Sequence, residues 1–279
     1  MNPNLKDGKG NSPLCLSLRT NAEDFRKLLV AGYDPFSKEE NIIEKCVMSD
    51  DLSFLNVLLQ EKGTTFICNS LFSKFWERQN DATFLRNRSH IAAVTLQMLS
   101  SPQELNVNVI NRLRTTPLLY FCEQNEEVVV ERLLERGADV NIRNNHGRTA
   151  LHTVLHSEER QNESYEEFLN FLLIYKKHGG KLEDVDRNGN TPLMLFLKHG
   201  LYDFDDTQDK LVDLIDEIVS ILACDGSTVR KRNNTGSSAI HIVSSKGWLS
   251  TMKILVQKGA KISEKDEEQN RWLHLSHMG

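Results

Sequence analysis

The 279-residue sequence has few of the features that mark membrane, secreted and metal-dependent proteins. It has no run of eighteen apolar residues, so a membrane-spanning helix is not expected. Its opening residues, MNPNLKDGKG, lack the basic and apolar segments of a secretory signal. Its five cysteines are scattered, odd in number and without a C-x-x-C pair. A disulfide framework and a zinc site are therefore not expected, and the predicted location is the cytoplasm, or the nucleus.

Catalytic and cofactor-binding motifs are also missing. No glycine pair is followed by the Lys-Ser or Lys-Thr of a phosphate loop, and no serine or cysteine lies in a nucleophile elbow. His152 and His156 are four residues apart, but Thr153 stands where a zinc protease needs glutamate. Residues 203–210, DFDDTQDK, resemble a calcium loop without its glycine and its final glutamate. We therefore expect neither an enzyme nor a cofactor.

What the sequence does have is a repeated signature. A polar turn containing Asn or Gly precedes a serine or threonine, often followed by proline, that opens an apolar stretch. This residue is Ser12, Thr116, Thr149, Thr191 or Ser238, and Arg271 stands at a sixth such place. The interval from Thr116 to Thr149 is 33 residues, as is that from Ser238 to Arg271. The two intervals between them are 42 and 47 residues, which indicates insertions of about 9 and about 14 residues.

The unit that begins at Thr116 illustrates the pattern. Thr116 can accept hydrogen bonds from the free N–H groups of a helix predicted over 117–124. A second helix is predicted over 127–135, and Gly137 supplies the left-handed residue that ends it. A polar loop over 139–148, in which Asn and Gly tolerate positive φ, turns the chain back. Such a unit cannot bury its apolar face alone, so neighbouring units must stack.

The segments GRTALH, GNTPLM, GNSPLC and LLERGADVN resemble ankyrin repeats, and the resemblance extends over nearly the whole chain. It implies an all-α solenoid of helix-turn-helix units joined by hairpin-like loops. We predict a single array of about seven repeats and a partial eighth. The predicted boundaries are 4–36, 37–66, 67–107, 108–140, 141–183, 184–229, 230–262 and 263–279. Both ends cut through the pattern, so a longer protein is expected.

Residues 37–115 fit the pattern least well. Asn41 takes the capping position of one degenerate unit, and Leu58 and Leu59 occupy the places of paired leucines elsewhere. The next unit is predicted to have two helices with a loop near 81–87. Three aromatic residues in its first helix are interpreted as core rather than as a binding surface: Phe72, Phe75 and Trp76.

The resemblance implies a protein partner, because ankyrin arrays mostly bind other proteins through hairpin tips and inner helices. Basic residues recur at the predicted tips, and stacking would align them into a basic edge on a chain with a net charge of -5. Such an edge would attract an acidic or phosphorylated segment. The alternative is that these arginines only keep exposed turns soluble. The candidate partner-binding residues are Arg112, Arg114, Arg143, Asn145, His146, Arg148, Arg187, Asn188, Arg230, Lys231 and Arg232.

The net charge, and the absence of aromatic residues among these arginines, argue against nucleic acid as the partner. The insertions, near 156–167 and 199–210, are predicted to loop out or to lengthen helices between the paired helices of two repeats. We predict a monomeric, non-catalytic scaffold or targeting module. Two alternatives stay open: an array that regulates an attached catalytic or channel domain, and a microbial effector that binds host proteins.

The resemblance also implies two local features. The histidines in the fourth place of the signature should bond locally and hold the turn; they are His152, His241 and His274. Asn141 lies eight residues after Leu133 and follows Asp139-Val140. This arrangement matches asparagines that an oxygen-dependent asparaginyl hydroxylase modifies in many ankyrin repeats, so hydroxylation of Asn141 is a hypothesis.

Overall fold

In the computed structural model, the regular structure of the described residues is helical and contains no strand, as an all-α protein requires. They fall into two compact units, of which one comprises residues 1–112 with 131–137 and the other 113–130 with 138–279. No helix in the described part of the chain has the length and apolar character needed to cross a membrane. The structure describes residues 6–35, 42–49, 51–60, 72–73, 75–76, 88–101, 104–156, 164–199 and 209–261.

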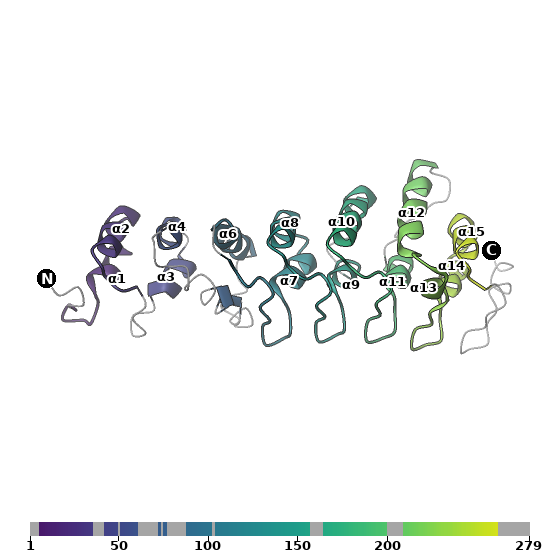
Figure 1. The fold of residues 1–279 in the computed structure, drawn as a ribbon, viewed down its shortest axis with the longest axis horizontal. Coiled ribbons are helices and arrows are strands. Elements are labelled where there is room, and N and C mark those ends of the chain that lie inside the picture. Colours follow the sequence, from purple (N-terminus) through teal and green to yellow (C-terminus); the bar gives the residue numbers. More distant parts are fainter. Residues whose placement is uncertain are drawn as a thin grey trace. The chain divides into compact units, whose positions relative to one another are not determined.

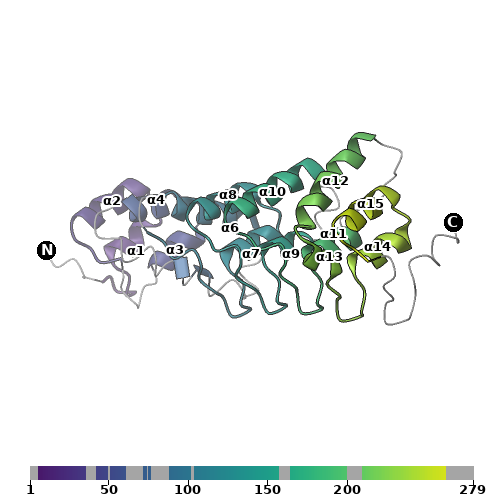
Figure 2. The ribbon, with the colours of Figure 1, turned by 45° about the vertical axis from the view of Figure 1, so that its right-hand side comes forward.

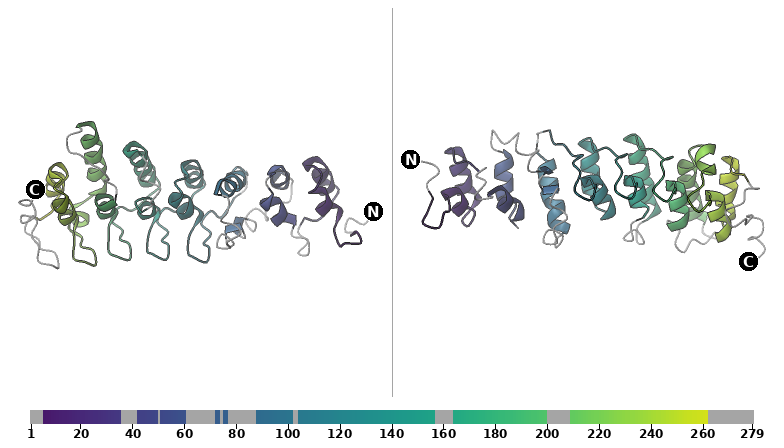
Figure 3. Two further views of the ribbon diagram at one scale, coloured as in Figure 1. Left: turned by 180° about the vertical axis from the view of Figure 1, so that it is seen from behind. Right: turned by 90° about the horizontal axis from the view of Figure 1, so that it is seen from below.

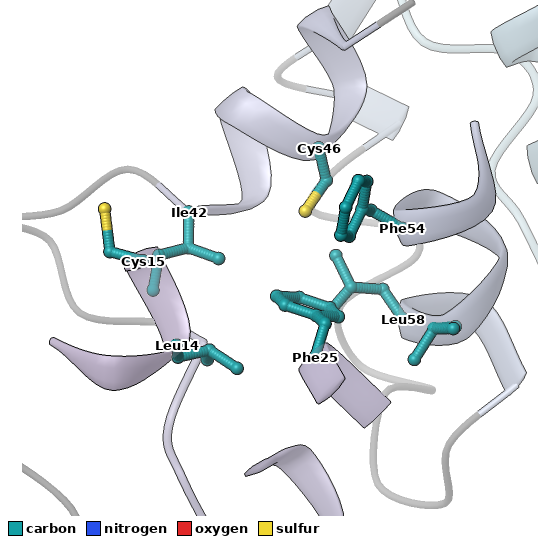
Figure 4. Close-up of a cluster of buried hydrophobic side chains, with 8 residues drawn as sticks. Leu14, Cys15, Phe25, Ile42, Cys46, Phe54 and Leu58 are labelled. Carbon is teal, nitrogen blue, oxygen red and sulfur yellow. The ribbon is translucent and has the colours of Figure 1, made fainter. Parts of the chain in front are cut away.

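The first unit is a succession of short helices whose apolar faces meet. Phe25 and Phe54 pack edge to face, with ring centroids 5.6 Å apart, beside the buried thiol of Cys46 (Figure 4). Burial raises the pKa of Cys46 to about 12, so it stays a neutral core thiol. The helices are α1 (Pro13–Ser17), α2 (Ala22–Val30), α3 (Ile42–Met48), α4 (Ser53–Gln60) and α6 (Arg88–Leu99).

Two predictions for the degenerate region are confirmed. Leu58 and Leu59 are buried. The aromatic residues of the next unit are core residues, because they are buried and pack against one another: Phe72, Phe75 and Trp76. The predicted cap at Asn41 and the loop at 81–87 lie outside the described residues.

The second unit stacks paired helices in two rows (Figure 1). An inner row has successive contacts from α7 (Pro117–Glu123) to α9 (Ala150–Val154), α11 (Pro192–His199) and α14 (Ala239–Lys246). An outer row runs through α10 (Tyr165–Lys177), α12 (Asp209–Leu222) and α15 (Leu249–Gln257). Helix α8 (Glu127–Glu135) crosses the boundary between the two units.

The signature residues cap the inner helices as the sequence predicts. Thr116 Oγ1 accepts a hydrogen bond from Leu119 N, and Thr191 Oγ1 accepts one from Met194 N, both at 3.2 Å. His152 Nδ1 lies 2.8 Å from Thr149 Oγ1. In the equivalent contact of a later repeat, His241 Nδ1 lies 2.7 Å from Ser238 Oγ. The predicted local role of these histidines is confirmed, and His274 lies outside the described residues.

The two insertions lengthen outer helices. Helices α10 and α12 have 13 and 14 residues, whereas α8 has 9. Ser164 and Glu167 form a capping box at the start of α10, so the end of the first insertion is helical. The sequence did not predict the short helix α13 (Gly226–Arg230), which Asp225 caps by accepting from Thr228 N at 2.6 Å. The remainder of the insertions, 157–163 and 200–208, is outside the described residues.

Candidate partner-binding surface

The hairpins of the second unit project beyond the inner row, and each is organised by one polar side chain at its start (Figure 2). Asn144 Oδ1 accepts from the backbone N–H groups of His146 and Arg148, at 2.9 and 3.1 Å. Asp186 and Asn233 make the equivalent pairs of bonds in the next two hairpins. A five-residue turn is thereby closed without a strand.

Glycine, rather than asparagine, takes the left-handed conformation in these turns. Gly147, Gly189 and Gly236 have φ of 70°, 75° and 72°. The expectation that asparagines in the loop after Gly137 also adopt positive φ is wrong, because the described non-glycine residues with positive φ are Arg114 and Asn125. Asparagine contributes its side-chain acceptor instead.

Backbone hydrogen bonds hold successive hairpins of the second unit together. Arg187 N donates to His146 O at 3.1 Å, and Asn234 N donates to Asn188 O at 2.9 Å. The close approach requires glycine: a Cβ on Gly189 would lie 3.0 Å from the Cα of Asn233. The tips of these hairpins are therefore fixed in register, as the row of loops in Figure 3 shows.

Four of the predicted basic residues contact the array itself. Arg143 forms an ion pair with Asp184 at 2.7 Å and donates to Val185 O at 2.9 Å. The other three donate to backbone carbonyls: Arg230 to Gly259, Lys231 to Glu183 and Arg232 to Gly236. These contacts occupy donors that a partner could otherwise use, and the charge of Arg143 is also offset by Asp184.

The remaining candidates are placed differently. Arg114 and Arg187 are exposed, and their guanidinium groups have no hydrogen bond or ion pair with another described residue. We call these two the unpaired arginines. Arg148 is half-buried in the second unit, whereas Arg112 is exposed and belongs to the first unit. The polar candidates of the second unit are His146 and Asn188, which are exposed, and Asn145, which is half-buried.

Arg114 differs from the equivalent residue of the other hairpins. It lies 33 positions before Gly147 and has a φ of 55°, where the corresponding residues are glycines. A side chain in this conformation costs about 1 kcal/mol relative to glycine. The chain therefore places an exposed guanidinium at this tip in spite of an unfavourable backbone conformation at Arg114.

Asn141, the candidate for hydroxylation, links the start of a hairpin to the segment that follows helix α10. Its Nδ2 donates to Gly179 O and its Oδ1 accepts from Lys181 N, both at 3.0 Å. Asn108 and Arg230 occupy the equivalent places of other repeats and donate to Gly137 O and Gly259 O. In these three repeats the side chain at this position binds the carbonyl that follows the outer helix.

Sequence reasoning missed a pair of histidines on the inner row. The rings of His156 and His199 lie with centroids 5.3 Å apart, next to the ends of α9 and α11. His152 does not share their environment, because it is buried while His156 is exposed. In the sequence, His156 follows Thr149 at nearly the same spacing as His199 follows Thr191. This shared spacing was the signal that could have revealed the pair.

The titratable groups form no evident metal centre. Within the described ranges, no three His, Cys, Asp or Glu side chains come together as metal ligands. The cysteines that the structure describes are free thiols: Cys15, Cys46, Cys122 and Cys224.

The sequence model of the family "Ankyrin repeats (3 copies)" matches residues 86–176, which include the Thr116 and Thr149 signatures and the Asn141 link. Residues 86–176 of the chain are ankyrin repeats. Ankyrin repeats generally mediate protein–protein interaction and are typically not catalytic. The family model covers three copies, so the count of seven repeats and a partial eighth remains a prediction.

Several curated relatives are similar over parts of this ankyrin-repeat chain. An ankyrin repeat protein of variola virus is 25% identical over 234 residues, which are 81% of this chain and 37% of the relative. The human neurogenic locus notch homolog protein 1 is 26% identical over 59% of this chain and 5% of its own length. A Rickettsia felis protein named for its ankyrin repeats is 30% identical over 37% of this chain and 45% of its own length. This chain thus spans little more than a third of the variola virus protein.

Proposed function

We propose that this ankyrin array is a non-catalytic recognition module that binds an acidic segment of another protein along the hairpin tips of its second unit. It acts as a monomer in the cytoplasm or the nucleus and uses no cofactor. The unpaired arginines, Arg114 and Arg187, supply the charge, and Arg148, His146 and Asn188 flank them. Arg112 belongs to the first unit and is a separate candidate for contact with a partner.

The main support for this proposal is the positive φ of Arg114. An exposed arginine at a positive φ is less stable than glycine, and backbone strain of this kind is often retained where a side chain is used. The hydrogen-bonded register of the hairpins that begin at Asn144, Asp186 and Asn233 supports the part assigned to Arg187, because a rigid tip binds with a smaller entropic cost than a mobile loop. Arg143 also donates to Val185 O, immediately before the hairpin that carries Arg187.

A pull-down from a cytosolic lysate tests the proposal, with the array immobilised at about 50 mM and at roughly 0.5 M salt. The binding variant is Arg114→Glu/Arg187→Glu. The control is Lys177→Glu/Lys253→Glu, which makes the same charge change at exposed sites on α10 and α15. We expect a partner that binds the wild type and the control at low salt but not the binding variant.

A partner retained equally by both variants would refute a role for the hairpin tips. Circular dichroism melting must show that the binding variant is as well folded as the control. Loss of the partner from both variants would mean that only net charge matters, and the site would then not lie on the hairpins.

The similarity to variola virus and Rickettsia felis proteins favours a second candidate, a microbial effector that binds host proteins. This is tested by placing a photo-crosslinking amino acid at Asn188 and expressing the chain in animal cells. A covalent adduct that disappears with Arg114→Glu/Arg187→Glu would support the effector. The absence of any adduct would count against it.

Hydroxylation of Asn141 is a separate proposal. Its amide is held by Gly179 and Lys181, so the enzyme would have to bind a locally opened repeat. Coexpression with an asparaginyl hydroxylase should add one oxygen to the intact mass, and the addition should be absent in Asn141→Ala. An unmodified wild-type mass would rule the proposal out.

A further inference from the structure

The ends of three consecutive inner helices bring together two lysines and two histidines. His156 follows α9, Lys198 and His199 end α11, and Lys246 ends α14. The imidazoles of His156 and His199 are 5.3 Å apart. Lys246 Nζ donates to Lys198 O at 3.2 Å and lies 4.4 Å from the ring centroid of Trp248, so its position beside α11 is fixed.

We propose that the histidine pair His156–His199 is the proton-dependent part of the binding surface and contacts a carboxylate-rich segment of the protein partner. This inference rests on the proposed function and extends its surface from the hairpins to the inner helices. The partner is an acidic peptide segment that passes from the unpaired arginines over the ends of α9 and α11. Its affinity rises as the histidines take up protons.

The charges around the pair are complementary to such a segment. The groups that face His156 are Arg148, Lys198 and Asp186, and its neighbour His199 also faces Lys246. Asp186 is the acid among them, and its Oδ1 already accepts from Asn188 N and Asn190 N. Hence cations predominate around the imidazoles.

The pKa values of the two histidines are shifted in the direction that burial and neighbouring cations would cause. Although His156 is exposed, partial desolvation of its ring, followed by the charge of Arg148, lowers its pKa. Burial also lowers the pKa of His199, with further contributions from His156, Lys198 and Lys246. Both rings are therefore mostly neutral near pH 7, and a bound carboxylate would favour their protonated form. By linkage, the same coupling must strengthen carboxylate binding when the pH falls.

The test uses fluorescein-labelled octaglutamate as the probe and fluorescence anisotropy as the readout, at about pH 7.5 and about pH 5.5, where its carboxylates stay largely ionised. We expect the wild-type affinity to rise at least about fivefold at the lower pH. The variant His156→Gln/His199→Gln should lose most of this rise. His178→Gln, an exposed histidine after α10, should keep it. Nuclear magnetic resonance titration of the imidazoles should show that the probe raises the pKa of His156 and His199.

Three results would overturn the inference. In the first, the double histidine variant keeps the wild-type pH response while Arg114→Glu/Arg187→Glu abolishes binding, so the proposed function stands without the histidine pair. In the second, octaglutamate binds at neither pH, and both proposals fail. In the third, single-stranded DNA binds more tightly with the same histidine dependence, which identifies nucleic acid as the ligand.

Discussion

Asn141 donates from its side-chain Nδ2 to the carbonyl oxygen of Gly179 at 3.0 Å, and so joins a hairpin to the end of the outer helix α10. The same amide accepts from Lys181 N through Oδ1. The Asn141 side chain thereby pairs with one backbone carbonyl, that of Gly179, and one backbone N–H, that of Lys181. Both belong to the segment between helix α10 and the following hairpin. This contact ties the hairpin to the outer helix, while backbone bonds such as that from Arg187 N to His146 O couple neighbouring repeats.

Replacing Asn141 with alanine should therefore destabilise the second unit. Two partly exposed hydrogen bonds are lost, which should lower the free energy of unfolding by about 1 kcal/mol. Urea denaturation monitored by circular dichroism measures the change. Asn170→Ala is the control, because Asn170 is exposed on α10 and should change stability by less than about 0.5 kcal/mol. Equal effects of the two substitutions would show that the Asn141 link is unimportant.

Replacing Arg114 with glycine should separate stability from binding. Glycine accepts the φ of 55° without steric cost, so the variant should gain about 1 kcal/mol in the free energy of unfolding. Its affinity for an acidic peptide should fall, because one unpaired arginine is gone. Arg112→Gly, at a residue without positive φ, should be neutral or destabilising. A less stable Arg114→Gly protein would contradict the strain assigned to this residue.

The sequence predicted the framework because the framework depends on local chemistry. Thr116 and Gly137 mark helix ends by capping and by left-handed geometry, which residue type alone specifies. It predicted the place of Arg143 correctly but not its ion pair with Asp184, because that depends on the spacing of two stacked repeats. The contact of His156 with His199 was missed for the same reason, since insertions separate the two repeats in sequence.

His152 should make stability depend on pH. Its ring is buried, and burial lowers its pKa to about 4, with a smaller opposing effect from Asp186. Between about pH 6.5 and about pH 4 the unfolded state binds a proton that the folded state does not, so stability falls as the pH falls. The full stabilisation is present above about pH 6.5, and the loss approaches about 1.4 kcal/mol per pH unit inside the window.

Urea midpoints between pH 7.5 and pH 4.5 measure this effect. His152→Asn should have a shallower dependence on pH than the wild type, although it is less stable at neutral pH because a well-packed ring is lost. His178→Gln is the control and should keep the wild-type slope, since His178 is exposed. Identical slopes for wild type and His152→Asn would show that this ring does not titrate in the window.

The salt dependence of octaglutamate binding tests the central claim most directly. Anisotropy titrations of the wild type, Arg114→Glu/Arg187→Glu and Lys177→Glu/Lys253→Glu would be compared over roughly 0.05 to 0.5 M salt. If the hairpin tips bind acidic segments, the wild type and the lysine control should bind tightly at low salt and at least about tenfold more weakly at high salt, whereas the arginine variant should bind weakly throughout. Equal binding by the two charge-matched variants at every salt concentration would contradict the claim.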